Sequence, residues 1–459
     1  MVLLKYELIF SHQKLYFSYM SKNNPKKSIV IIGNGISGIT AARHIRKASS
    51  HEITIISDET PYFFSRTALM YVYMGHMRFE HTQPYEDHFW VKNKINLVHK
   101  RVTGIDPYKR ILELEEGSTL GYDQLVIATG SKPNRFGWPG QDLKAVQGLY
   151  HKQDLDQLEV WSDSIQAATI VGGGLIGIEL AEMLHSRGKK VHFLVRESSF
   201  WNKILPPEES EMINKHIRAH GIDLQLETEL KAIESDENGR AKGVFTSKEE
   251  FIESQWVGLS VGVSPNIDFL KESELAIGRG IKVNAFLETN LPNIYAIGDC
   301  AEQTEPIPGR RPIEAVWYTG RMMGETLAKT LTGEKTKYAP GPWFNSAKFF
   351  DIEYQTYGTV SASPNPKTEA HLFWIHPNKE QSIRLSFNPS NGELLGAISM
   401  GIRLRHLVFE EWLKKKTQMD TVIDCFKQAN FDPEFYPTYE KELSKAWDLL
   451  KSKNNLLTK

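Results

Sequence analysis

Gly33-Asn-Gly35-Ile-Ser-Gly38 and Gly172-Gly-Gly174-Leu-Ile-Gly177 are two copies of one glycine pattern, one domain-length apart. The first follows the apolar run Ser28-Ile-Val-Ile-Ile32 and the second follows Ala168-Thr-Ile-Val171, and a helical pattern comes after each copy. In such a strand–loop–helix turn, the first glycine permits the tight turn, the second lets a pyrophosphate approach the backbone, and the third lets the helix pack on the strand. One copy alone is weak, because a glycine-rich turn can also serve packing, but two copies in matching context predict two dinucleotide sites.

The strand that follows each helix indicates which dinucleotide belongs to which copy. Counting along Ile53–Asp58 and Val191–Arg196 places Asp58 and Arg196 at the same step. A carboxylate there accepts hydrogen bonds from ribose hydroxyls, whereas a guanidinium suits a 2′-phosphate. We therefore assign FAD to the first copy and NAD(P) to the second. Arg196, with Lys203, favours NADPH, but Glu197 beside it leaves NADH open, and an arginine at a strand end is also a common solvated charge.

Two further motifs resemble a known family. Tyr122-Asp-Gln-Leu-Val-Ile-Ala-Thr-Gly130 is similar to its strand-plus-ATG turn, and Asn293-Ile-Tyr-Ala-Ile-Gly-Asp299 is similar to its strand-plus-GD motif. Together with Gly262-Val-Ser-Pro-Asn266, the order of motifs over residues 28–335 resembles the two-dinucleotide-binding-domain flavoproteins of the pyridine nucleotide-disulfide oxidoreductase superfamily. The resemblance implies that Asp299 hydrogen-bonds the ribityl chain of FAD.

The cysteines select a branch of this superfamily. The chain has only Cys300 and Cys425, so it lacks the CxxxxC pair of the disulfide reductases, and the segment Pro61–Leu69 lacks the single flavin-facing thiol of other branches. Arg66 stands in that segment, in a pattern that resembles ferredoxin and rubredoxin reductases and the flavin module of nitrite reductases, where an arginine lies along the FAD. The sequence departs from ferredoxin reductases at Met70 and Tyr71, which occupy the steps where those enzymes carry a serine and then a lysine.

These cysteines also bear on metals and location. Cys300 is expected to be a small buried residue rather than a reactive thiol. Two cysteines without a CxxC spacing predict no metal site, neither zinc nor iron–sulfur, and a reducing, cytoplasmic compartment.

The predicted site residues fall into two sets. For FAD they are Gly33, Gly35, Ile36, Ser37, Gly38, Asp58, Glu59, Arg66, Val102, Ala128, Thr129, Gly130, Asp299 and Trp317. For NAD(P) they are Gly172, Gly174, Leu175, Ile176, Gly177, Glu179, Arg196 and Gly262. Glu179 is the one candidate for a catalytic role, because the family residue at this step faces the cofactor. Taken alone, it is equally a helix-start carboxylate favoured by the helix dipole.

The implied fold class is α/β, with two Rossmann-like three-layer dinucleotide-binding domains and a C-terminal α+β domain. The predicted boundaries are an N-terminal extension over 1–27, with Met1 or Met20 as the start, an FAD-binding domain over 28–150 and 258–335, an inserted NAD(P)-binding domain over 151–257, and a C-terminal interface domain over 336–459.

Four segments add local expectations within these domains. Asp223–Glu227 and Gly243–Ser247 are predicted to complete the sheet of the inserted domain, with a hairpin turn at Asp236–Gly239. A helix over Ile313–Leu331 is expected to begin near the flavin.

Composition excludes several classes of function. A net charge of -1 gives no basic surface for nucleic acid, and no apolar run reaches the roughly eighteen residues of a membrane span. The first twenty residues lack a cleavage site, so no signal peptide is predicted. A hydrophobic content of 41% with 24% charged residues is ordinary for a soluble enzyme.

Function follows from the two cofactors. Nicotinamide stacked on the isoalloxazine passes hydride to flavin N5, and the protein supplies position and electrostatics. Without a thiol pair, electrons are expected to leave to a ferredoxin, rubredoxin or Rieske protein, or to a separate reductase subunit. Two alternatives stay open: reduction of a quinone or dioxygen, and a redox-sensing flavoprotein resembling the apoptosis-inducing factors. The resemblance also implies a C-terminal domain that covers the flavin or forms a homodimer interface.

Overall fold

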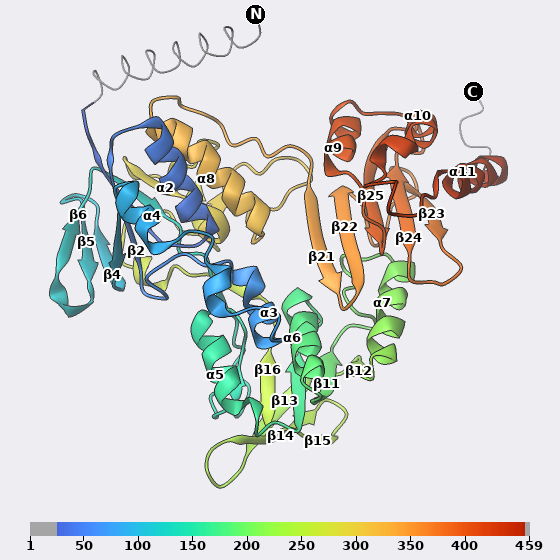
Figure 1. Ribbon diagram of the computed structural model, residues 1–459, viewed down its shortest axis with the longest axis horizontal. Helices are drawn as coiled ribbons and strands as arrows, with labels where there is room; N and C mark the ends of the chain where they lie inside the picture. Colours follow the sequence, from blue (N-terminus) through green and yellow to red (C-terminus); the bar gives the residue numbers. More distant parts are fainter. Residues whose placement is uncertain (1–24, 455–459) are drawn as a thin grey trace, which may run out of the picture. The chain divides into compact units, whose positions relative to one another are not determined.

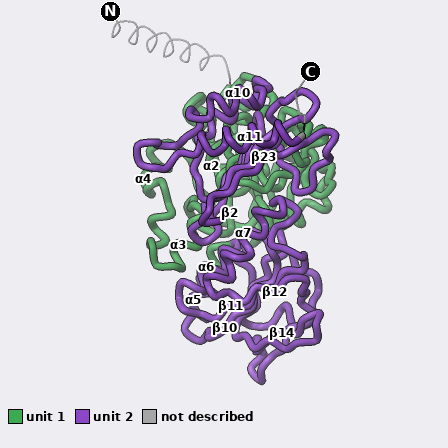
Figure 2. The backbone as a smooth tube through the Cα atoms, turned by 90° about the vertical axis from the view of Figure 1, so that its right-hand side faces the viewer, with its two compact units in different colours: residues 1–132, 151–153, 263–339 green, residues 133–150, 154–262, 340–459 purple. Residues whose placement is uncertain are grey.

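The computed structural model describes residues 25–454, so the predicted extension over 1–27 lies mostly outside the described residues, as does the choice between Met1 and Met20. The chain divides into two compact units (Figure 2). The first unit holds the chain up to Lys132, His151–Gln153 and Val263–Ala339, and the second holds Pro133–Tyr150, Asp154–Gly262 and Pro340–Lys459.

The first unit is built on a five-stranded parallel sheet with the order β19-β7-β1-β2-β3. Its central strand carries an unbroken run of Ile and Val that is buried on both faces, as parallel sheets covered by helices require. The strands are β1 (Ser28–Ile32), β2 (Glu52–Ser57), β3 (Ile95–His99), β7 (Gln124–Ile127) and β19 (Ile294–Ala296).

Helices α2 (Ile36–Ala48) and α8 (Trp317–Leu331) lie side by side on this sheet (Figure 1). Their close approach depends on glycines one turn apart in α8. A Cβ atom at Gly320 would lie 2.5 Å from Ser37 Oγ, and one at Gly324 would lie 2.6 Å from the Ser37 carbonyl oxygen. The helix expected from Ile313 begins four residues later, because Val316 has an extended backbone.

Smaller elements complete the first unit. They are helices α3 (Leu69–Tyr73) and α4 (Asp87–Lys92), an antiparallel sheet of β4 (Val102–Asp106), β5 (Ile111–Leu114) and β6 (Thr119–Gly121), and the short strands β8 (Ser131–Pro133), β17 (Val263–Pro265), β18 (Ile281–Val283) and β20 (Ala301–Gln303).

The second unit repeats the parallel architecture with the strand order β12-β11-β10-β16-β9. The sheet uses β9 (Val146–Gln147) and β16 (Trp256–Leu259), so it reaches beyond the predicted 151–257 range at both ends. The remaining strands and the helices of this part are β10 (Ala167–Val171), β11 (Lys190–Val195), β12 (Asp223–Leu226), α5 (Lys152–Ser162), α6 (Leu175–Ser186) and α7 (Pro207–Ala219).

One strand prediction for this sheet is wrong. Asp223–Leu226 joins the parallel sheet as expected, but the second predicted segment lies in β14 (Ala241–Thr246), which belongs to a separate antiparallel sheet with β13 (Leu230–Ser235) and β15 (Phe251–Glu253). The hairpin turn between β13 and β14 is present where it was expected. Asp236 Oδ1 accepts hydrogen bonds there from the backbone of Asn238 and Arg240. That tight turn pairs β14 with its neighbour in sequence, which keeps it out of the parallel sheet.

The C-terminal part of the second unit confirms the predicted α+β arrangement. Five antiparallel strands have the order β21-β22-β25-β24-β23, and helices pack on the sheet around a core that includes Phe409, Phe426 and Trp447. The elements are β21 (Phe344–Phe349), β22 (Ile352–Gly358), β23 (Ala370–Ile375), β24 (Ser382–Phe387), β25 (Leu394–Met400), α9 (His406–Lys414), α10 (Met419–Asp424) and α11 (Glu440–Asn454). Within residues 25–454, none of the helices combines the length and the apolar character needed to cross a bilayer.

A buried ion cluster joins α7 to β24. Arg384, whose side chain is 5% exposed, donates from Nε to Glu209 Oε1 at 2.8 Å and from Nη2 to Glu208 Oε2 at 2.7 Å. Glu209 is fully buried and Glu208 is about half exposed. Burial raises the pKa of Glu209, although Arg384 opposes this effect. The cluster therefore depends on the arginine, because a buried charge that loses its partner is costly.

We expect Arg384→Met to destabilise the protein by about 3 kcal/mol, because it leaves the Glu209 carboxyl buried and unpaired. The matched control is Glu208→Gln, which removes the exposed partner and should cost under about 1 kcal/mol. Thermal unfolding followed by tryptophan fluorescence checks both variants. Equal small shifts in the two unfolding temperatures would show that the cluster contributes little.

Candidate dinucleotide-binding sites

The three glycines of the first fingerprint have distinct surroundings. Gly33 has a positive φ of 107°, and a Cβ atom there would lie 2.2 Å from the Ala128 carbonyl oxygen. A Cβ atom at Gly38 would lie 2.2 Å from the Gly33 carbonyl oxygen, whereas one at Gly35 would meet nothing within 4 Å. Gly33 and Gly38 thus permit close packing, and Gly35 leaves open space at the start of α2. This cradle fits a pyrophosphate on the first backbone N–H groups of a helix.

The second fingerprint repeats the arrangement. Gly172 has a φ of 112°, and a Cβ atom there would lie 2.5 Å from the Ser260 carbonyl oxygen. A Cβ atom at Gly177 would lie 2.3 Å from the Gly172 carbonyl oxygen, and Gly174 again has nothing within 4 Å. Leu175 and Ile176 open α6 as Ile36 and Ser37 open α2. Both sites therefore have the shape that a dinucleotide requires.

Backbone register confirms the alignment of the two copies. The Gly33 N–H donates to the Ile56 carbonyl at 2.8 Å, and the Gly172 N–H donates to the Leu194 carbonyl at 3.0 Å. Counting from these two anchors, Asp58 and Arg196 lie at the same step, and Glu59 and Glu197 lie one step later.

The two acidic residues of the first copy have different surroundings. The Asp58 side chain is 61% exposed, with the Arg101 Nε 4.0 Å away, whereas the Glu59 side chain is 10% exposed. Arg66 donates to both oxygens of Glu59, at 2.9 and 2.5 Å, and the Lys152 backbone N–H also donates to it, at 2.9 Å.

The Glu59 carboxyl is ionised in this arrangement. Although burial raises its pKa, hydrogen bonds from His151 and Arg66 prevail and lower it to about 2. The sequence predicted Glu59 and Arg66 as separate FAD contacts, and the structure joins them as an ion pair. It also adds His151 and Lys152, which no motif had indicated.

The ATG and GD motifs meet at the end of β7. Thr129 Oγ1 donates to the Asn266 carbonyl at 2.7 Å, and Ser131 Oγ donates to Asp299 Oδ2 at 3.0 Å. A Cβ atom at Gly298 would lie 2.4 Å from Ser37 Oγ, so the GD turn lies against the first fingerprint. The structure therefore brings Asp299 and both ends of the predicted FAD set together, and it adds Ser131. Val102, also predicted, is buried at the start of β4.

A buried ion pair precedes α8. Arg310 donates from Nε and Nη2 to the two oxygens of Glu314, at 2.6 and 2.7 Å, and both side chains are 6% exposed. Trp317 follows in the first turn of α8, edge-on to Tyr318 with ring centroids 5.5 Å apart. Because α8 packs on α2 through Gly320, its first turn lies near the first fingerprint. Sequence reasoning predicted Trp317 and missed the ion pair, because Arg310 and Glu314 lie before the helix and belong to no motif.

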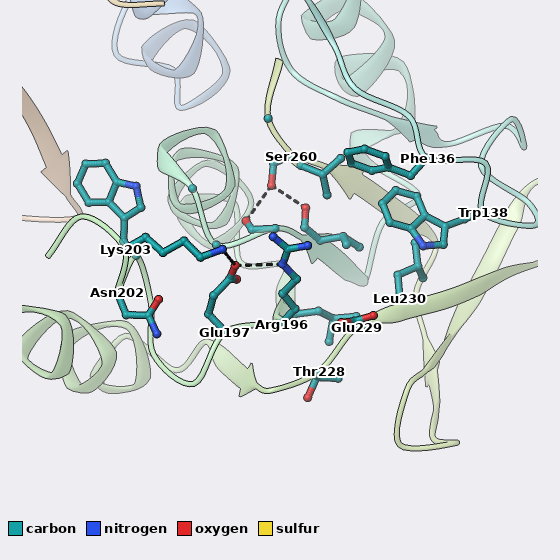
Figure 3. A pocket seen from close by; sticks show the side chains of 18 residues that line it. Phe136, Trp138, Arg196, Glu197, Asn202, Lys203, Thr228, Glu229, Leu230 and Ser260 are labelled. Carbon is teal, nitrogen blue, oxygen red and sulfur yellow. Dashed lines mark hydrogen bonds and ion pairs between the residues drawn. The ribbon is translucent and has the colours of Figure 1, made fainter. Parts of the chain in front are cut away.

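The second copy opens into a pocket of about 390 Å³ (Figure 3). Four predicted residues line it, namely Gly172, Gly174, Arg196 and Gly262. Figure 3 shows Phe136 and Trp138 on one side of the pocket and Asn202 and Lys203 on the other. The two aromatic rings are edge-to-face, with centroids 5.4 Å apart. They lie in a segment between strands that carries no motif, so sequence reasoning had no signal for them.

Two cations share one carboxylate at the pocket wall. Glu197 Oε1 accepts hydrogen bonds from Arg196 Nε at 3.0 Å and from Lys203 Nζ at 3.2 Å. Although burial raises the pKa of Glu197, these two bonds hold it below its ordinary value. Arg196 and Lys203 are 64% and 70% exposed, and in the described part of the chain Arg196 Nη1 and Nη2 have no protein partner. The outer edge of the guanidinium is therefore available to a ligand.

Glu179 lies in the second turn of α6 and is partly buried. Burial, and then the nearby Glu182 carboxylate, raise the pKa of Glu179 to about 7. Glu182 itself is paired with Lys348 Nζ at 2.8 Å. A carboxyl with such a pKa can hold or release a proton near neutral pH.

Cys300 is buried, as predicted. Its Sγ lies 3.3 Å from the Ile297 carbonyl oxygen and 3.5 Å from that of Ile127, and burial raises the pKa of the thiol to about 11. A protonated, enclosed thiol of this kind is not a nucleophile at neutral pH.

Comparison with known proteins agrees with this geometry. Residues 27–324 match the family described as pyridine nucleotide-disulphide oxidoreductase. A 5,5′-dehydrodivanillate O-demethylase ferredoxin reductase subunit from Sphingobium is 30% identical over 343 residues, which cover 74% of this chain and 83% of that protein. A rubredoxin-NAD(+) reductase from Acinetobacter baylyi is 30% identical over 320 residues, covering 67% of this chain and 79% of that protein.

A solved structure shows the same fold. The ferredoxin reductase from Rhodopseudomonas palustris superposes with a TM-score of 0.75 at 23% identity, covering 82% of this chain and 91% of that chain. The expected α/β class, with two Rossmann-like parallel sheets and a C-terminal antiparallel sheet, is confirmed.

We expect Glu179→Gln to change how stability depends on pH. The folded protein keeps the Glu179 proton up to about pH 7, while the unfolded chain releases it near the ordinary value of 4.5. The raised pKa therefore makes the wild type lose stability as pH rises through this window. The variant should match the wild type near pH 4 and exceed it above pH 7. Melting temperatures measured across this pH range test the prediction. The control is Glu237→Gln, in the exposed β13–β14 turn, which should keep the pH dependence of the wild type. Melting temperatures of Glu179→Gln and the wild type that change with pH in the same way would contradict the prediction.

Proposed function

Because this chain belongs to the pyridine nucleotide-disulphide oxidoreductase family, we propose that it is an NAD(P)H-dependent flavin reductase that delivers electrons to a separate carrier protein. The family binds FAD and NAD(P)H, and its chemistry is flavin-dependent oxidoreduction. The acceptor proposed for this chain is a ferredoxin, a rubredoxin, a Rieske protein or a separate reductase subunit.

The observation that carries the proposal is the position of the cysteines. The whole chain has two, and Cys300 is enclosed with a raised pKa while Cys425 belongs to the C-terminal part. A dithiol relay next to the flavin is therefore not available to this chain, and Arg66, fixed by Glu59, stands in the segment where related branches place a thiol. Electrons then have to leave for an outside acceptor. The two relatives are a ferredoxin reductase subunit and a rubredoxin reductase, which supports a redox protein in that role.

The residues of the first unit suit FAD. The open space at Gly35 accommodates the pyrophosphate. The exposed carboxylate of Asp58, after β2, would accept hydrogen bonds from the hydroxyls of the adenosine ribose. Asp299, held by Ser131, would accept a hydrogen bond from a ribityl hydroxyl. The positive end of α8 would favour negative charge on the cofactor. Bound FAD supplies the acceptor for a hydride and can then release electrons one at a time.

The residues of the second fingerprint suit a nicotinamide dinucleotide. The open space at Gly174 accommodates the pyrophosphate, and the pocket wall at Arg196 and Lys203 suits a 2′-phosphate. Glu197, already bound by both cations, keeps a second oxygen that suits a ribose hydroxyl. We propose that NADPH is the better donor and that NADH is also accepted.

Anaerobic stopped-flow mixing of the purified, FAD-loaded protein with NADPH and with NADH tests this function. We expect bleaching of the flavin that is faster with NADPH, persists when air is admitted, and is reversed by oxidised ferredoxin or rubredoxin. Prompt reoxidation by air alone would instead indicate an oxidase. A stable charge-transfer complex that no acceptor discharges would indicate a redox sensor, and failure of both donors would contradict the proposal.

We expect Arg196→Ala to raise the KM for NADPH on the order of tenfold, the factor that about 1.4 kcal/mol of lost interaction produces. The KM for NADH should change little, because NADH has no 2′-phosphate for the guanidinium to bind. Steady-state kinetics with both donors measures this difference. Lys215→Ala is a matched control, since Lys215 is an exposed lysine of the same sheet domain that pairs with Glu211 away from the pocket. Equal increases in the KM values for NADPH and NADH would contradict the proposal that Arg196 binds the 2′-phosphate.

A further inference from the structure

Two histidines and an aspartate meet outside both dinucleotide sites. His216 lies in the last turn of α7, and His220 caps that helix four residues later, so both imidazoles project from one side of the helix end. Asp351 lies in the two-residue turn between β21 and β22. The turn belongs to the C-terminal sheet, so the three side chains connect two parts of the second unit that are far apart in sequence.

The ligand atoms of these side chains are close enough to share one ion. His216 Nε2 lies 2.5 Å from Asp351 Oδ1, His220 Nε2 lies 3.7 Å from the same oxygen, and the three ligand atoms are all within 4.8 Å of one another. Ligand atoms around tetrahedral Zn²⁺ lie about 3.3 Å apart, given bonds of about 2.0–2.2 Å. The observed separations bracket that value. Among residues 25–454, this is the one group of three or more metal-binding side chains at such distances.

The imidazole of His220 is oriented as a ligand should be. Its Nδ1 lies 2.9 Å from the His216 backbone carbonyl oxygen, so Nδ1 carries the proton and donates it there. In the neutral imidazole, the lone pair then lies on Nε2, which is 3.7 Å from Asp351 Oδ1. Histidines that bind metals usually donate their other N–H in this way to a carbonyl or carboxylate. Phe350 stacks on the face of the imidazole, with ring centroids 4.3 Å apart, and limits its rotation.

The three side chains differ in their exposure to solvent. The side chain of His216 is 9% exposed, that of His220 is 29% exposed and that of Asp351 is 77% exposed. An ion can therefore arrive from solvent on the Asp351 side and retain a water molecule there. Two imidazoles and one carboxylate with an open position form a donor set that suits Zn²⁺ and related divalent transition ions better than Mg²⁺ or Ca²⁺, which prefer all-oxygen sites.

We propose that His216, His220 and Asp351 bind a divalent transition ion, with Zn²⁺ as the best match, and that this ion fastens the end of α7 to the β21–β22 turn. The site shares no residue with the sets assigned to FAD and NAD(P), and we assign it a structural role within the second unit. The expectation of no metal site came from the cysteines alone. The signal it passed over is the His-x-x-x-His spacing of His216 and His220, which the structure places at the end of α7.

Isothermal titration of the tag-free, FAD-loaded protein with ZnCl₂ tests the proposal. We expect one equivalent to bind per chain, and we expect Asp351→Asn and His220→Gln each to weaken binding about 100-fold. Asp351→Asn should fold normally because its side chain is exposed. His192→Gln is the matched control: His192 forms a similar pair with Asp223, at 2.7 Å, but has no third ligand, so its loss should leave the affinity unchanged.

Thermal unfolding gives a second measurement that does not depend on activity. Saturating ZnCl₂ should raise the melting temperature of the wild type and of His192→Gln, but not that of Asp351→Asn. Zinc affinity in the wild type no greater than in Asp351→Asn would overturn the proposal and leave the cluster as an ordinary His–Asp ion pair. Loss of binding in His192→Gln alone would also overturn it, because the ion would then lie at the other pair.

Discussion

At the first glycine of each fingerprint, the backbone packs directly against the backbone of a neighbouring strand end, and both glycine turns take their shape from this contact. Gly33 and Gly172 both turn sharply at the end of a strand, and each lies so close to a neighbouring carbonyl, at Ala128 and Ser260, that no side chain can be inserted. These contacts fix where the following helix begins relative to the sheet. The helix start in turn determines which backbone N–H groups are available to a phosphate. The glycine turn at each site can therefore form only because the first residue has no side chain.

The two copies share a scaffold but differ in how their charges are arranged. After β2, an arginine, a histidine and a backbone N–H converge on Glu59, which is nearly enclosed. At the matching step after β11, Glu197 accepts from two exposed cations that still face the solvent. An enclosed, fully satisfied carboxylate suits a cofactor that stays bound. An exposed cluster whose cations can change partners suits a dinucleotide that binds and leaves in each cycle.

Much of the fold was predictable because its determinants are local. Five-residue apolar strands followed by glycine turns specified the two parallel sheets, and alternating strands and turns indicated the C-terminal sheet. The assignment of Gly243–Ser247 to the parallel sheet failed because a hairpin turn, itself correctly predicted, decides which neighbour a strand pairs with. The site residues divide in the same way. The motif residues Asp299 and Gly262 were predicted, and the structure places Asp299 beside the ATG motif and Gly262 in the pocket lining. Ser131, His151 and Phe136 were not predicted, since their neighbours in these sites come from segments distant in sequence.

The ion cluster of Arg384, Glu208 and Glu209 bears on how this chain can be divided. Arg384 of β24 covers the side of α7 that carries Glu208 and Glu209, which would otherwise be open to water. A shortened chain ending after α8 would keep both glycine fingerprints but would expose Glu209 and the surface around it without their partner. The C-terminal sheet is therefore integrated with the parallel-sheet part of the second unit, and losing it in the course of evolution would require compensating changes along α7.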